Sequence, residues 1–211
     1  MNTGKLLNSK IYQILDFVMR LVILNVIIVF VSLPLFTLLA AITAGHSVIR
    51  KMAEDRGTSI FKEFFRTFIQ VLGKTAMLSL FIILVIVVLI NSGFFFFQTM
   101  GDGIIYVIGF LLTISVGFVI IACIQHLPII ISYFPDLRTI DSIKLMFLFS
   151  ARYPMLTIYL LLPVVIIFVE IGLFYGIVAF LGFSLPIYVG YLLSYRSYRV
   201  IYEKNKGDKN Q

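Results

Sequence analysis

Three charged side chains interrupt apolar stretches of this sequence: Asp16, Arg20 and Glu170. An ionisable group inside a bilayer is costly, so each is a candidate either for transport chemistry or for a buried polar contact that fixes helix packing. Glu170 lies well inside a stretch that begins near Met155, and Arg20 is its candidate partner from another stretch. In the alternative arrangement, Asp16 and Arg20 pair on one helix face and leave Glu170 without a cation.

The remaining polar residues offer little catalytic chemistry. Asn25 is expected to hold helices together by hydrogen bonds rather than to bind a ligand. His46 and His126 have no carboxylate or thiolate at ligand spacing, and Cys123 is the only cysteine, so we expect no metal site, disulfide or cofactor. The sequence contains no nucleophile elbow, zinc-protease motif or P-loop, so we do not expect an enzyme, and a partner must hydrolyse any ATP that is used.

The composition is that of a membrane protein. Of the 211 residues 61% are hydrophobic and only 13% are charged, whereas about 25% are charged in soluble domains. We therefore predict a single polytopic membrane domain over residues 1–202, followed by a polar cytoplasmic tail over residues 203–211. The net charge of +7 fits membrane topology better than nucleic-acid binding, for the reason given next.

The apolar stretches predict an all-α bundle of six transmembrane helices. Two stretches, 11–48 and 155–193, are too long for one crossing of a hydrocarbon core about 30 Å thick, and each contains a proline near a natural turn, Pro34 and Pro186. If residues 11–50 cross only once, the number is five. The six predicted crossings are 11–32, 35–50, 76–97, 104–126, 155–179 and 185–202.

The basic residues support this topology. All 17 lysines and arginines fall in four groups that six crossings bring to one side, and the loops around Pro34, 98–102 and 182–184 contain none. Because loops rich in lysine and arginine remain in the cytoplasm, we predict that both termini are cytoplasmic.

Two segments between crossings have helical amphipathic patterns. The segment Thr58–Lys74 has polar residues on one face, including Lys62, Glu63 and Arg66, and a weaker segment, Thr139–Tyr153, stops at Pro154. We predict that both are cytoplasmic surface helices and that the aromatic face of the first contacts lipid or a protein partner. That face consists of Phe61, Phe64, Phe65 and Phe68.

The region from Asn25 to Phe68 resembles the YesL family of bacterial integral membrane proteins. The matching positions are Asn25, Leu33, Pro34, Thr37, Ala41, Ala44, Arg50, Lys51, Phe64, Phe65 and Phe68. The chain departs from the family in having no tryptophan, which members often carry in the first span. The resemblance implies a place in the bacterial plasma membrane and a link to carbohydrate uptake through ATP-driven sugar importers or sensor systems. It implies no biochemical activity.

Three functions from different classes follow. The first, which we favour, is an accessory or regulatory membrane component that binds sugar-importer subunits or a sensor kinase through its surface helices. The second is a transporter or permease component that moves a small solute itself, using Glu170 and Arg20. The third, an intramembrane enzyme, has no catalytic residues to support it.

Overall fold

The protein is helical in every element that the computed structural model describes, which covers residues 10–54, 59–173 and 181–208. The predicted all-α class is confirmed over these residues. The elements are α2 (Lys10–Ser32), η1 (Leu35–Thr37), α3 (Leu38–Ala53), α4 (Ile60–Gln98), η2 (Met100–Asp102), α5 (Ile104–Ile124), α6 (His126–Tyr133), α7 (Thr139–Arg152), α8 (Pro154–Tyr159), α9 (Leu162–Leu173) and α11 (Ser184–Asp208).

Among the residues that the structure describes, four stretches of helix are long and apolar enough to cross a membrane: Tyr12–Ser32, Ile60–Gln98, Ile104–Tyr133 and Pro154–Gly172. The chain is therefore a helical membrane protein. Two other predicted crossings, 35–50 and 185–202, are also helical, but α3 has only 16 residues, or about 24 Å, and α11 carries several charges. Residues 174–179 of the fifth predicted crossing lie outside the described residues.

Helix α3 is the centre of the bundle, and it packs against α2, α4, α6 and α11. Ala40, Ala41 and Ala44 on α3 are fully buried. A Cβ atom added at Gly45 would lie 2.9 Å from side-chain atoms of both Ile28 and Ile187. The small residues therefore allow α2, α3 and α11 to approach one another closely.

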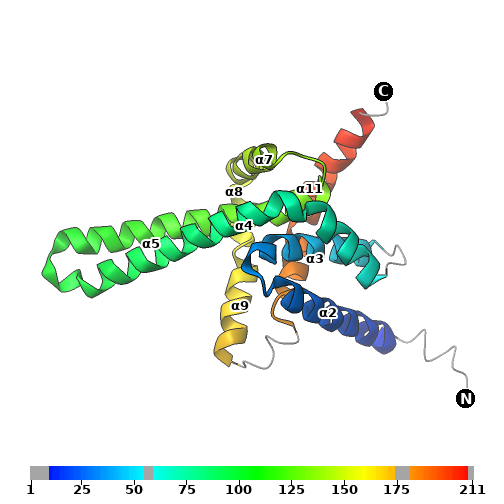
Figure 1. Ribbon diagram of the computed structural model, residues 1–211, viewed down its shortest axis with the longest axis horizontal. Coiled ribbons are helices and arrows are strands. Elements are labelled where there is room, and N and C mark those ends of the chain that lie inside the picture. Colours follow the sequence, from blue (N-terminus) through cyan, green and yellow to red (C-terminus); the bar gives the residue numbers. More distant parts are fainter. Residues whose placement is uncertain (1–9, 55–58, 174–180, 209–211) are drawn as a thin grey trace, which may run out of the picture.

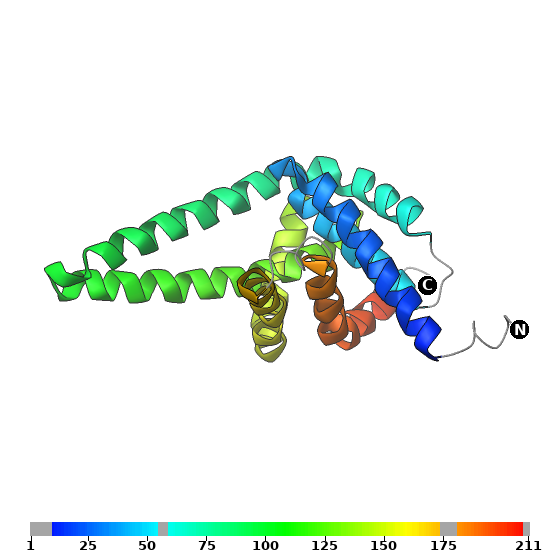
Figure 2. The ribbon, with the colours of Figure 1, turned by 90° about the horizontal axis from the view of Figure 1, so that it is seen from below.

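Helix α4 differs from the prediction. We expected a surface helix over Thr58–Lys74 and a separate crossing over 76–97, but one continuous helix of 39 residues runs through both. Its ribbon bends where it leaves the bundle and then pairs with α5 in a long projecting hairpin (Figures 1 and 2). The Thr75 hydroxyl donates to the Val71 carbonyl at 2.9 Å, and such bonds bend helices without ending them.

The second surface segment ends as predicted, whereas the segment assigned to the tail begins as part of a helix. Helix α7 ends at Arg152 and α8 begins at Pro154, so the predicted stop at this proline is confirmed. Residues 203–208, which we assigned to a tail, continue helix α11.

Buried helix ends in this fold are satisfied by side chains from other elements. Asn25 is fully buried, and its Oδ1 atom accepts hydrogen bonds from the backbone N–H groups of Phe183 at 2.7 Å and Ser184 at 3.2 Å. The N–H of Leu39, in the first turn of α3, donates to Ser79 Oγ at 2.8 Å. These bonds fix where α11 and α3 begin relative to α2 and α4.

The turn between α2 and α3 is closed by Thr37. Its hydroxyl lies 2.5 Å from the carbonyl oxygen of Val31 and 2.6 Å from that of Pro34. A helix cannot continue through Pro34 without losing a backbone bond, and Thr37 supplies a donor for the carbonyl groups that the break leaves behind.

We expect Asn25→Ala to lower the free energy of unfolding by about 1–3 kcal/mol, because it leaves two backbone N–H groups at the start of α11 without their acceptor. The measurement is unfolding of the purified protein in detergent. Asn91→Ala is the matched control, since Asn91 is exposed and bonds only to Val87 of its own helix. Equal small effects of the two substitutions would show that the Asn25 contact is unimportant.

Candidate functional site

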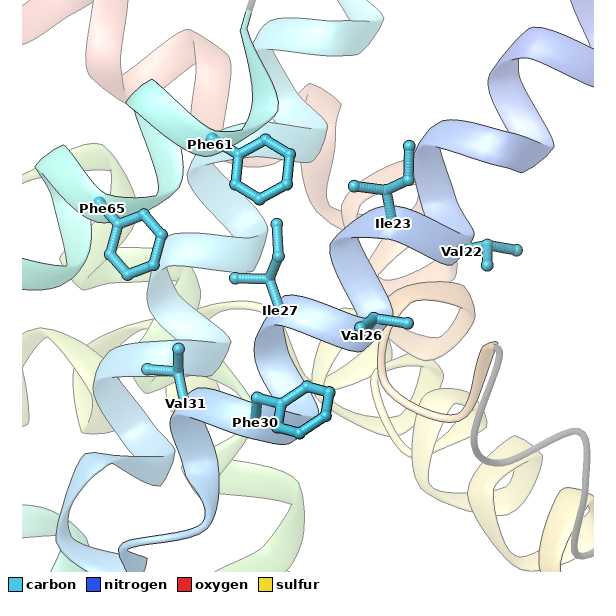
Figure 3. Close-up of a pocket in the computed structure, with 8 residues that line it drawn as sticks. All are labelled: Val22, Ile23, Val26, Ile27, Phe30, Val31, Phe61 and Phe65. Carbon is cyan, nitrogen blue, oxygen red and sulfur yellow. The ribbon is translucent and has the colours of Figure 1, made fainter.

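An apolar groove lies between α2 and the start of α4 (Figure 3), with a volume of about 450 Å³. No polar side chain lines it. Along α2 the lining side chains form two parallel rows with a spacing of four residues, and α4 supplies two phenylalanines that face them. The lining residues are Val22, Ile23, Val26, Ile27, Phe30, Val31, Phe61 and Phe65.

The four phenylalanines predicted to form a partner or lipid surface divide into two groups. Phe64 is fully buried, and its ring packs against those of Phe65 and Phe68, with centroids 5.5 and 6.0 Å away. Phe61 and Phe65 are 56% and 42% exposed and lie over the groove. Phe64 therefore anchors α4, while Phe61 and Phe65 remain available for contact.

The polar face of the same segment divides similarly. Lys62 and Arg66 are exposed, but Glu63, which the sequence predicted on the same polar face, is buried, as is Thr67. Both buried residues contact Ser47 of α3. Burial of Glu63 is possible because Lys51 Nζ lies 2.6 Å from its Oε1 atom.

Hydroxyl groups complete this junction. Ser47 donates to Glu63 Oε1 at 3.1 Å, and the Thr67 hydroxyl lies 3.2 Å from Ser47 Oγ and 3.3 Å from the same carboxylate oxygen. The Lys51–Glu63 junction thus joins the last turn of α3 to the first turn of α4.

Of the two pairings considered for the charged residues in apolar stretches, the structure shows the one in which Asp16 pairs with Arg20 and Glu170 has no cation. Arg20 Nε lies 2.7 Å from Asp16 Oδ2 on the same helix. Glu170 is 7% exposed, and neither of its carboxylate oxygens has a hydrogen-bond partner among the described residues. Arg20 and Glu170 are therefore not paired.

A second, smaller cavity lies between α3, α9 and α11. Its volume is about 100 Å³, and its polar lining consists of His46 and Gln125. Ligand pockets usually have volumes of about 300 Å³ or more, so this cavity can hold water molecules but not a sugar.

His126 forms a polar network that the sequence did not reveal. It is fully buried; its Nδ1 atom lies 2.5 Å from the Tyr198 hydroxyl and its Nε2 atom 2.9 Å from the Thr157 hydroxyl. The Thr157 hydroxyl also lies 3.1 Å from the carbonyl of Tyr153. If Thr157 donates its single proton there, it must accept from Nε2–H, and Tyr198 then donates to Nδ1. The network links α6, α8 and α11.

The only sequence signal for this network is the tyrosine spacing in α11. Tyr191, Tyr195 and Tyr198 recur at intervals of four and three residues, which places them on one helix face. Aromatic residues at this spacing in an apolar segment are common, so the pattern by itself does not identify their partners.

The residues that carry the YesL resemblance mostly lie at the junctions already described. Asn25 caps α11, Thr37 closes the α2–α3 turn, Ala41 and Ala44 are buried in the centre of α3, and Lys51 pairs with Glu63. Leu33 and Pro34 are exposed in the turn.

Comparison with known proteins gives one match. Residues 21–92 match the model of a family described as protein of unknown function, DUF624. No curated protein and no solved structure matches the chain. The matched residues include α3, the groove and the Lys51–Glu63 junction. Within the described residues, no three His, Cys, Asp or Glu side chains are grouped as a metal site would require.

We expect the Lys51 and Glu63 side chains to be energetically coupled by about 0.5–3 kcal/mol, since they are in direct contact. Lys51→Met and Glu63→Gln should each destabilise the protein by leaving one charge without its partner, and the double variant should recover part of the loss. Unfolding in detergent measures all three. The same double-mutant cycle on the exposed Asp16–Arg20 pair should give a coupling energy of only about 0.3–0.5 kcal/mol. Simple additivity of the two single effects at Lys51 and Glu63 would contradict the expectation.

Proposed function

We propose that this protein is an accessory or regulatory component of a bacterial plasma-membrane system for carbohydrate uptake, and that it binds an apolar helix of a partner in the groove between α2 and α4. The observation that carries the proposal is the groove itself, which is wholly apolar and is bordered by two exposed phenylalanines. The link to carbohydrate uptake comes from the YesL resemblance, and it supports importer subunits or a sensor kinase as partners.

The two rows of side chains on α2 favour a helix as the occupant. One row is Val22, Val26 and Phe30, and the other is Ile23, Ile27 and Val31. Rows with a spacing of four residues are the ridges between which the side chains of a second helix pack. From Val22 to Val31 the rows extend about 14 Å, which is enough for more than two turns of a partner helix.

The proposal includes the six-crossing topology with both termini in the cytoplasm. Two observations support it. Phe17 packs on Tyr188 at 4.9 Å while Asn25 bonds to Phe183, so α2 and α11 are antiparallel. Gly45 faces Ile187 and the next residue, His46, faces Gly190, so α3 and α11 are parallel and their basic ends point the same way.

The proposal predicts that a photo-reactive residue in the groove captures a membrane partner. We would place it at Ile23 or Phe65 in cells grown on plant polysaccharide sugars, and identify the attached protein by mass spectrometry. The matched control is Phe94, which is 61% exposed on the α4–α5 hairpin. Capture of one importer subunit or sensor kinase from both groove positions, and not from Phe94, is expected. Lipid adducts alone, or equal capture at Phe94, would refute the docking role.

A second candidate function, a transporter or permease component, is favoured by Glu170. A buried carboxyl group without a partner in the described residues is the kind of site that carries protons or cations through membrane proteins. Under this hypothesis, Glu170→Gln abolishes solute uptake by cells or vesicles while protein abundance stays unchanged. Normal uptake by that variant would remove the hypothesis.

A further inference from the structure

Helix α7 is held at a boundary of the membrane by the two apolar stretches that flank it. The stretch Ile104–Tyr133, which is long enough to cross a bilayer, is joined to α7 by residues 134–138, and only Tyr153 separates α7 from the next such stretch, Pro154–Gly172. Figure 1 shows α7 at the outside of the bundle, beside α8. Connections this short keep a helix of 14 residues at the level where both stretches leave the hydrocarbon core.

One side of α7 packs on the bundle and the opposite side is bare. The inner side consists of the buried residues Ser142, Met146 and Phe149, and the ring of Phe149 stacks on that of Tyr198 from α11, with centroids 4.6 Å apart. The outer side carries three large apolar side chains at helical spacing. They are Ile140, Phe147 and Leu148, and they are 66%, 59% and 57% exposed.

The outer side of α7 also carries two cations. Lys144 and Arg152 are exposed and lie four residues before and after Leu148, so the three side chains follow one another along the helix. Neither cation takes part in the salt bridges formed among the described residues. Arg138, the exposed residue before the helix, adds a third cation, whereas Asp141 is the one acidic residue of α7. Basic groups therefore outnumber acidic groups on this surface.

The acidic residue of the linker before α7 is engaged by a different helix. Asp136 Oδ1 accepts a hydrogen bond from Gln70 Nε2 of α4 at 3.2 Å, and Asp136 acts electrostatically on Lys74. Lys74 Nζ in turn donates to the carbonyl groups of Pro135 and Leu137. The linker is thereby fastened to α4, which fixes the start of α7 and directs the linker carboxylate toward α4.

We propose that the outer side of α7 is a binding surface for anionic phospholipids. The two cations lie beside the apolar side chains, so they can contact phosphate groups of the headgroups while those side chains enter the upper part of the acyl region. Lipid satisfies both halves of the surface at once, whereas water would leave Phe147 and Leu148 solvated and a zwitterionic headgroup would leave the charge excess unbalanced. The surface is separate from the groove between α2 and α4 and needs no partner there.

The test uses the absence of tryptophan from the sequence. Phe147→Trp places a single indole on the outer side of α7, and the full chain carrying it is reconstituted in vesicles of phosphatidylcholine and phosphatidylglycerol. Either lipid is supplied in brominated form, which quenches indole fluorescence on contact. We expect emission at shorter wavelengths than in water, and a binding constant for phosphatidylglycerol about two- to fivefold higher than for phosphatidylcholine, because basic residues near the surface attract anionic lipid.

Two sets of variants assign the preference to α7. In the Phe147→Trp chain, Lys144→Gln combined with Arg152→Gln should bring the ratio of the two binding constants close to unity, because both cations are lost while the apolar contact remains. Both positions are exposed, so the fold should be retained. Asp141→Asn should raise the ratio instead, because it removes the opposing charge.

The matched control is an indole in lipid at a site without cations. Phe94 is 61% exposed on the α4–α5 hairpin, and the sequence has no lysine or arginine between Lys74 and Arg138. Phe94→Trp should therefore be quenched by both brominated lipids with no preference between them.

Three results would overturn the proposal. Equal binding of the two lipids at Phe147→Trp, or a preference that persists after both cations are removed, would show that the surface does not select anionic lipid. Quenching by iodide in the water and not by brominated lipid would place this side of α7 in solvent. Resistance to both quenchers would show that a second copy of the chain covers it.

Discussion

The need to satisfy the backbone polar groups at buried helix ends and turns governs this fold. Asn25 accepts from the first N–H groups of α11, Ser79 accepts from the first turn of α3, and the Thr37 hydroxyl donates within the turn that Pro34 creates. The first two of these bonds join different helices, and all three replace hydrogen bonds that water would otherwise make. The helices are thereby set in register by polar contacts, and the apolar side chains between them fill the remaining space.

Helix α3 is also joined to its neighbours by charged side chains. The residues in its first half are small and apolar, so α2 and α11 can approach it closely. Its last turn carries two cations, Arg50 and Lys51. Lys51 faces α4 and is neutralised by Glu63, whereas Arg50 faces α6 and stacks on Tyr133. The Lys51–Glu63 junction and the Arg50–Tyr133 contact therefore lie on different sides of one helix.

Hydropathy and helical periodicity were enough to predict the all-α class and most helix limits, such as α2 and the stop before Pro154. They failed where a distant residue decides the outcome. Helical periodicity predicts that Glu63 lies on the polar, exposed face of its helix. Its burial is favourable only because Lys51 pairs with it across the α3–α4 junction. The contacts of His126 with Tyr198 and of Arg50 with Tyr133 join residues more than seventy positions apart, and no local pattern encodes them. Nor does a local pattern show that α4 continues past Lys74.

The cap that Asn25 provides also bears on how the protein is made. Its acceptor oxygen meets a backbone donor 158 residues later in the chain, and at 5–20 residues per second a ribosome needs about 8–30 s to supply it. Throughout that interval the Asn25 amide lacks this partner, while the intervening helices are being synthesised. The buried amide of α2 is therefore satisfied only after the start of α11 has been synthesised, so this contact forms late in the assembly of the bundle.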